Sequence, residues 1–219
     1  MTTPRSRRDS AAPQPSRTPL VVGVVVALVL VAGLVAWLVT RSSGNGDAGE
    51  APVFGEVSIE GEALPALAEG ADPSTDSAVG TVAPVATGAD FSGAPVTLES
   101  AGQPTVLLFL AHWCPHCQAE VPAMQEWLDG GGLPEGTQVL SVATAQDSTL
   151  PNFPPAAWLE EEGWTPPVLV DDESSTAANA FGLSRFPFWV FLDSAGNVAA
   201  RAVGEIEPEA IGEVLASLP

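Results

Sequence analysis

Residues 105–117 read TVLLFLAHWCPHC, an apolar run that leads directly into a pair of cysteines. The continuous apolar character of 105–110 is typical of a strand buried on both faces of a sheet. A helix is expected from about Cys114 to Leu128, because three glycines at 130–132 then act as a stop signal. The two cysteines therefore stand at a junction between strand and helix.

Cys114 and Cys117 are the only cysteines among the 219 residues. A disulfide between them would close almost no loop and add little stability, so a chemical role is expected. A cysteine at a helix N-terminus faces unpaired backbone N–H groups that favour its thiolate, and a cysteine three residues on lies within disulfide reach. Cys114 is thus the predicted nucleophile and Cys117 the resolving thiol. Trp113 would shield the pair, and a charged His116 would favour the thiolate further.

Two other uses of a CxxC motif were weighed against redox chemistry. A structural zinc site needs four ligands, and His112 and His116 are the only additional nitrogen candidates, too close together for an easy tetrahedron. Covalent haem attachment needs a histidine at position 118, which is Gln. We therefore expect no cofactor and no metal. A metal-binding chaperone that uses the His/Cys cluster stays an alternative, as does an inert interaction module.

The charge of the chain is strongly negative and unevenly distributed. There are 27 acidic residues, seven arginines and no lysine, for a net charge of −20. Asp9 is the one acid before residue 42, and Arg185 and Arg201 are the only cations after it. A surface this acidic repels phosphates, which excludes nucleic acid as a partner.

An uncharged apolar run at 20–39 predicts a membrane anchor. Twenty such residues in a helix span the bilayer core of about 30 Å. A cleaved signal peptide is the alternative, but its apolar region is shorter and ends in an A-x-A-like site that is missing here. Four arginines precede the run and one follows it, so we expect the N-terminus in the cytoplasm and the rest outside. The predicted regions are a cytoplasmic basic tail (1–19), a transmembrane anchor (20–40), an extracytoplasmic linker or extension (41–79) and a folded domain (80–219).

Within 80–219, strand and helix patterns alternate, which favours an α/β domain with a central sheet covered on both faces. A solvated acidic turn is expected at 171–173. The aromatic residues Trp158, Trp164 and Trp189 are interpreted as packing residues, with a groove lining as the alternative. The further strands are expected at 95–98, 139–143, 168–170, 188–192 and 198–203, and the further helices at 155–162, 175–181 and 208–218.

A family pattern W-C-x-x-C-x-x-E-x-P is matched by Trp113, Cys114, Cys117, Glu120 and Pro122. With Pro187 at the place of a cis-proline, residues 80–219 resemble the thioredoxin superfamily, and specifically the membrane-anchored TlpA/ResA-like thiol–disulfide oxidoreductases. This resemblance implies a thioredoxin-like fold, a central mixed sheet flanked by helices, behind an N-terminal transmembrane helix. It also implies protein thiol or disulfide substrates, a membrane redox partner and a Pro187 that faces the cysteines.

The departures from the family bear on proton transfer and on redox direction. Leu108 replaces the buried acid of thioredoxins, so Glu120, at i+3 from Cys117, is the candidate for proton transfer, with a solvated carboxylate as the alternative. The Pro115-His116 dipeptide resembles that of the DsbA oxidases, whereas the scaffold resembles reductases of cytochrome c maturation. Because His116 and the helix terminus act directly on the sulfur, we expect an oxidising or isomerising role.

Overall fold

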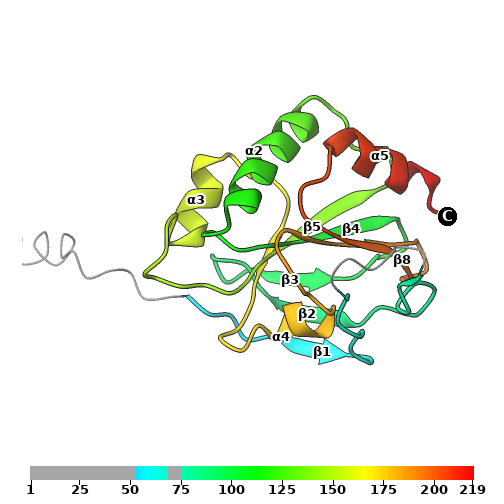
Figure 1. The fold of residues 1–219 in the computed structure, drawn as a ribbon, viewed down its shortest axis with the longest axis horizontal. Coiled ribbons are helices and arrows are strands. Elements are labelled where there is room, and N and C mark those ends of the chain that lie inside the picture. Colours follow the sequence, from blue (N-terminus) through cyan, green and yellow to red (C-terminus); the bar gives the residue numbers. More distant parts are fainter. Residues whose placement is uncertain (1–52, 69–74) are drawn as a thin grey trace, which may run out of the picture. The chain divides into compact units, whose positions relative to one another are not determined.

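The computed structural model describes residues 53–68 and 75–219 (Figure 1). The elements are, in chain order, β1 (Ser58–Glu60), β2 (Val85–Ala89), β3 (Pro95–Leu98), β4 (Thr105–Leu110), α2 (Pro115–Asp129), β5 (Gln138–Ala143), α3 (Pro155–Glu161), β6 (Val168–Val170), α4 (Thr176–Ala180), β7 (Phe188–Leu192), β8 (Val198–Val203) and α5 (Pro208–Ser217). The predicted elements from β3 onward are confirmed, with ends that differ by one residue at most.

The centre of the domain is a five-stranded mixed sheet in the order β6-β5-β4-β7-β8. β4 pairs parallel with β5, and β5 pairs parallel with β6. β7 is antiparallel to both β4 and β8. The predicted thioredoxin-like α/β fold with a central mixed sheet is confirmed, and β4, which leads into the cysteines, is its middle strand.

Every residue of β4 is buried because both faces of the sheet are covered. Leu107 and Phe109 point into one apolar cluster. This cluster also contains residues of α4 and of a second sheet, formed by β1, β2 and β3. Val106, Leu108 and Leu110 point into the other cluster, with residues of α2, α3 and α5. In Figure 1 these three helices lie above the sheet, and α4 lies below it. The two cysteines belong to the cluster on the α2 side.

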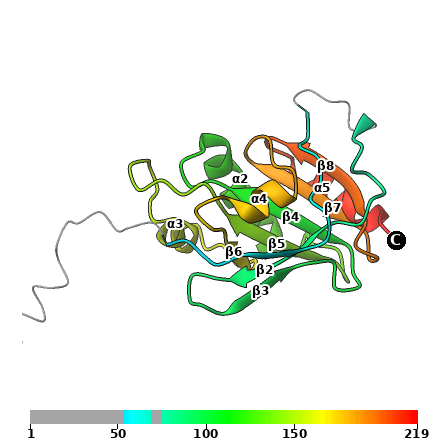
Figure 2. The ribbon, with the colours of Figure 1, turned by 90° about the horizontal axis from the view of Figure 1, so that it is seen from below.

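A second, three-stranded sheet precedes the central one, with the order β1-β2-β3 and antiparallel pairing throughout. β1 and β2 were not predicted, since each is short and β2 contains a glycine. Figure 2 shows β2 and β3 next to β6, where residues of these strands are in contact. The sheet thus covers the face of the central sheet opposite α2.

The segment before residue 80 is part of the same folded unit. Leu64 and Leu67 are buried in the core, and their N–H groups donate to Ala180 O at 2.8 Å and to Gly182 O at 3.0 Å. The sequence predicts that the domain starts at residue 80, and it does not decide whether the preceding extension is ordered. The structure adds 53–68 and 75–79 to the folded unit, with Leu64, Leu67 and Ala78 in its core.

A buried ion pair ties this early segment to β8. The Arg201 guanidinium donates to both carboxylate oxygens of Asp76, at 2.8 and 2.6 Å. It also donates to Pro65 O at 2.8 Å and to Phe181 O at 3.0 Å. The hydrogen bonds from Arg201 hold the pKa of Asp76 below its ordinary value. Gly182 adjoins this cluster with φ +75°, and a Cβ there would lie 2.4 Å from Pro65 O, so only glycine fits.

The acidic turn at 171–173 differs from its prediction. Asp171 is buried, not solvated, and its carboxylate accepts the N–H groups of Ala177 at 2.9 Å and Ala178 at 3.1 Å. These are donors at the start of α4 that lack partners within the helix. The prediction of a solvated residue is therefore wrong for Asp171. Its carboxylate accepts hydrogen bonds from N–H groups at the start of α4, and the sequence pattern did not indicate this contact.

Within the described parts of the chain, no helix combines the length and the apolar character that crossing a membrane requires. The apolar run at 20–39, on which the predicted anchor rests, lies outside those parts.

Candidate active site

Cys114 occupies the N-cap of α2, at the end of the turn that follows β4. Its backbone is extended, with φ −78° and ψ 119°, and Pro115 starts the helix with a ring that suits the first helical position. Cys117 lies in the first turn. Both are free thiols, Cys114 with 6% of its surface exposed and Cys117 with none. The strand-to-helix junction predicted for the pair is confirmed.

The two thiols lie in different electrostatic surroundings. Burial raises the pKa of the Cys117 thiol far above its ordinary value, and the nearby Cys114 and Glu120 raise it further. A hydrogen bond with the Ala111 backbone acts in the opposite direction but is outweighed. Cys117 therefore stays a thiol until a base takes its proton, whereas Cys114 is the sulfur that an incoming group can reach.

The bond between Phe186 and Pro187 is cis, as predicted. Phe186 O lies 3.9 Å from Cys114 Sγ, so the pair, which immediately precedes β7, packs against Cys114. The Phe186 ring meets Trp113 edge-on, with ring centroids 5.7 Å apart. Trp113 is held in turn by the hydrogen bond from its Nε1 to Ala145 O at 2.7 Å. The two aromatic side chains thus pack against each other, one from the residue before Cys114 and one from the residue whose carbonyl meets the Cys114 sulfur.

Glu120 is a buried carboxyl one turn beyond Cys117, with 2% of its surface exposed. Its Oε2 accepts the Ile206 N–H at 3.0 Å. Burial raises the pKa of Glu120 to about 7, and the neighbouring Glu205 and Glu207 carboxylates add to the rise. The alternative of a solvated helix carboxylate is therefore wrong. Glu120 can take up and release a proton near neutral pH, beside a thiol that needs a base.

Leu108 lies fully buried in β4, opposite Trp189 of β7, in the same cluster as the cysteines. Trp189 and Trp158 are buried and Trp164 packs against that cluster, which confirms their interpretation as packing residues. No acid reaches the cysteines from β4, so Glu120 of α2 is the buried acid on this side of the sheet.

His112 is buried and uses both of its ring nitrogens within the protein. Nδ1 lies 2.7 Å from Pro151 O, and Nε2 accepts the Asp147 N–H at 3.1 Å. With Nε2 as an acceptor, Nδ1 is the nitrogen that donates, to Pro151 O. A metal ion would have to displace one of these bonds. Across the described residues, no group of three or more His, Cys, Asp or Glu side chains is placed to hold a metal.

In the loop between β8 and α5, Gly204 also fits the family resemblance, but the sequence does not point to Glu205 or Ile206. The carboxylate of Glu205 lies 2.6 Å from His116 Nδ1, and both side chains are exposed. Gly204 N–H donates to Pro187 O at 2.9 Å, and Ile206 N–H to Glu120. A glutamate in a chain with 27 acids carries no signal of its own, and Glu205 is 89 residues from its histidine partner.

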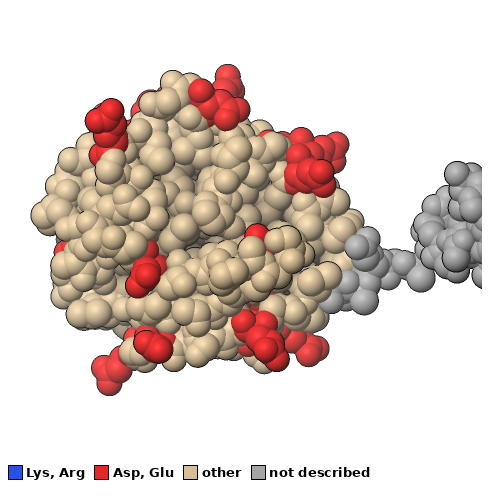
Figure 3. All heavy atoms as spheres, turned by 180° about the vertical axis from the view of Figure 1, so that it is seen from behind, with Lys and Arg blue, Asp and Glu red and all other residues tan. Residues whose placement is uncertain are grey.

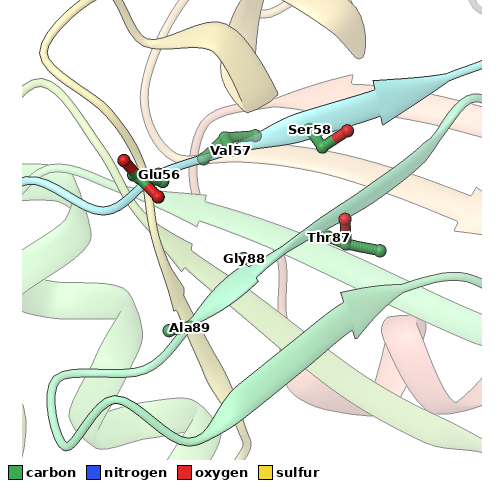
Figure 4. Close-up of a pocket in the computed structure, with 6 residues that line it drawn as sticks. All are labelled: Glu56, Val57, Ser58, Thr87, Gly88 and Ala89. Carbon is green, nitrogen blue, oxygen red and sulfur yellow. The ribbon is translucent and has the colours of Figure 1, made fainter.

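One pocket lies away from the cysteines. It measures about 620 Å³ and lies along β1 and β2, where Glu56, Val57 and Ser58 face Thr87, Gly88 and Ala89 (Figure 4). Its lining contains no sulfur and one carboxylate, so it is separate from the cysteine pair.

A thioredoxin-like sheet with a CxxC pair at the start of α2 and a cis-proline beside it defines a protein of thiol–disulfide chemistry. Comparison with known proteins agrees, since the model of the AhpC/TSA family matches residues 79–209. The chain belongs to this family. It is a thiol–disulfide oxidoreductase similar to ResA and DsbF.

The individual relatives are distant in sequence. The thiol–disulfide oxidoreductase ResA of Geobacillus thermodenitrificans is 28% identical over 142 residues, which cover 64% of this chain and 78% of that protein. A putative thiol:disulfide interchange protein DsbE from Chlorobium tepidum has a TM-score of 0.53 at 24% identity, with 64% of this chain and 98% of that chain covered. MTB DsbF has a TM-score of 0.50 at 26% identity, with 61% and 94% covered.

Proposed function

We propose that this chain is a membrane-tethered, extracytoplasmic oxidoreductase that exchanges disulfides with protein substrates through its CPHC motif. The observation that carries the proposal is the asymmetry of the two sulfurs. Cys114 keeps 6% of its surface exposed, next to the Phe186 carbonyl, whereas Cys117 has none exposed. Such an arrangement lets one sulfur meet the substrate and reserves the other for the second step.

In the oxidising direction, a substrate thiolate attacks Cys114 Sγ of the Cys114–Cys117 disulfide. The S–S bond breaks, and the Cys117 sulfur leaves as a thiolate that takes a proton from Glu120. A second substrate thiolate then attacks the mixed disulfide and releases Cys114. The substrate thiols lose two protons to solvent and two electrons to the enzyme, which holds the electrons as the Cys117 thiol and the Cys114 thiolate, and Glu120 regains its proton from water. A disulfide of a membrane redox partner would take the two electrons from this reduced pair.

The surface of the domain fits protein substrates and not nucleic acid. Acidic side chains are scattered over the face drawn in Figure 3, and that face has no lysine or arginine. Of the two arginines after residue 42, Arg201 is buried in its ion pair with Asp76. A substrate segment would instead meet the aromatic side chains of Trp113 and Phe186 beside Cys114.

The membrane tether is supported by the apolar run at 20–39 and the arginines around it. Protease added to intact cells without their wall should digest the domain and leave a protected fragment of about residues 1–40, detectable by an N-terminal tag. Recovery of a soluble chain that begins after residue 40 would instead identify the run as a cleaved signal, and the tether would be wrong.

For the direction of exchange, we propose an oxidising or isomerising role. A helix N-terminus and a charged histidine both stabilise the thiolate of the reduced form, which makes the disulfide more oxidising. In equilibrium with glutathione, the potential should lie nearer to the value of about −120 mV for DsbA than to that of about −270 mV for thioredoxin. His116→Ala should move it to more negative values.

A reductase of the cytochrome c maturation type is the second candidate, and the ion pair of His116 favours it. When the ring is protonated, Glu205 balances its charge at 2.6 Å, so less of the positive field reaches Cys114. The same redox titration separates the candidates. A wild-type potential below that of thioredoxin would reject the oxidising role and support the reductase.

A further inference from the structure

The four residues from Gly204 to Glu207 touch three separate parts of the active site. Gly204 N–H holds the carbonyl of Pro187 at 2.9 Å, and Glu205 holds the imidazole of His116 at 2.6 Å. Ile206 N–H donates to the carboxyl of Glu120 at 3.0 Å. One short loop therefore links the cis-proline, the residue between the cysteines and the buried acid.

A cavity connects the buried acid to this loop. It measures about 150 Å³ and is lined by Ala119, Glu120, Ala123, Glu205, Ile206, Glu207 and Pro208. A space of this size with carboxylates in its wall can hold water. Glu120 is otherwise buried, so the cavity is its route for proton exchange with solvent.

The titratable groups around Glu120 come from two elements. On α2 it is the thiol of Cys117, which in turn lies next to Cys114, and on the loop after β8 they are the carboxylates of Glu205 and Glu207. Both glutamates raise the pKa of Glu120, because a second negative charge nearby is unfavourable. Of the two, Glu205 is the one that also pairs with His116.

We propose that Glu205 is a positioning residue for the exchange reaction. Its carboxylate ties His116 to the loop, and its negative charge sets how readily Glu120 takes the proton of Cys117 and releases it again. This role rests on the proposed exchange at Cys114 and Cys117. When a mixed disulfide on Cys114 is resolved, Glu120 takes the Cys117 proton and the Cys117 thiolate attacks Cys114 Sγ. The outgoing thiolate leaves, and the proton passes from Glu120 through the cavity to water.

The test is the pH dependence of that resolving step in the full chain, with glutathione as the outgoing group. Its rate should rise with pH and level off above about 7, because Glu120 accepts a proton only in its charged form. Glu205→Gln removes one negative charge, so the inflection should move to lower pH, by about half a unit or more at low ionic strength. Added salt should shrink the difference.

Three controls identify the source of that shift. Glu120→Gln should remove the inflection, and this result would assign the inflection to the Glu120 carboxyl. Glu209→Gln, the same change at an exposed glutamate outside the cavity, should leave the profile of the wild type. With only two histidines in the chain, NMR can follow each ring, and Glu205→Gln should change the His116 signals and not those of His112. Equal thermal midpoints would establish that the variants fold.

The possible results separate this inference from the proposed function. If the wild type resolves the glutathione adduct but Glu205→Gln keeps its inflection, or Glu209→Gln moves it equally, the role of Glu205 is wrong and the exchange stands. If the wild type forms no glutathione adduct at Cys114, the proposed exchange fails, and the role of Glu205 fails with it.

Discussion

Cys114→Ala should lower the rate of disulfide exchange by about a thousandfold or more, because loss of a covalent nucleophile removes the reaction path itself. The matched variant, Cys117→Ala, keeps the nucleophile at the helix N-cap and loses the sulfur that resolves the intermediate. It should accumulate mixed disulfides with its protein substrates in native membranes. Non-reducing electrophoresis followed by mass spectrometry would detect these adducts and identify the substrates.

The same asymmetry should appear in the wild type without any mutation. In the reduced protein at neutral pH, iodoacetamide should modify Cys114 tens of times faster than Cys117. Cys117 is fully buried, and its burial raises the pKa of its thiol, so very little thiolate is available to react. Faster modification of Cys117, or adducts that accumulate on Cys114→Ala in place of Cys117→Ala, would reverse the roles of the two sulfurs.

Arg201→Met should destabilise the domain by about 3–5 kcal/mol, the usual effect of removing one partner from a buried ion pair. The change leaves the Asp76 carboxylate buried and removes the donors to Pro65 O and Phe181 O. Urea unfolding followed by tryptophan fluorescence measures the loss.

The Asp76–Arg201 pair also predicts a pH dependence with a definite sign. Since Arg201 lowers the pKa of Asp76, the charged carboxylate stabilises the folded state above the ordinary value of 3.8. This stability is lost as the pH falls through the lowered pKa of the folded protein. Arg201→Met should lack this acid-dependent loss, and adding Asp76→Asn should recover part of its stability at pH 7. An additive double mutant would contradict coupling between the two side chains.

The reactive end of the site could be predicted because it is local in sequence. The apolar run 105–110, the cysteine pair and the glycines 130–132 lie within 28 consecutive residues. Strand periodicity, helix-end chemistry and spacing act over that range, so they place Cys114 at the N-cap and Cys117 one turn on. The position of Pro187 opposite the cysteines was predicted from the family resemblance, because sequence spacing alone does not show which residues face this proline.

Tertiary structure decided the partners of the charged residues. Glu205 reaches His116 across 89 positions, Ile206 reaches Glu120 across 86, and Arg201 reaches Asp76 across 125. In a chain with 27 acidic residues, nothing in the local sequence distinguishes one of these acids from another. Packing selects which of them are buried or paired, when β8 and its flanking loops meet α2 and the early segment. The sequence by itself therefore determined the fold class and the place of the two cysteines at the start of α2. Their electrostatic surroundings depend on desolvation and on charges close in space, which no local pattern records.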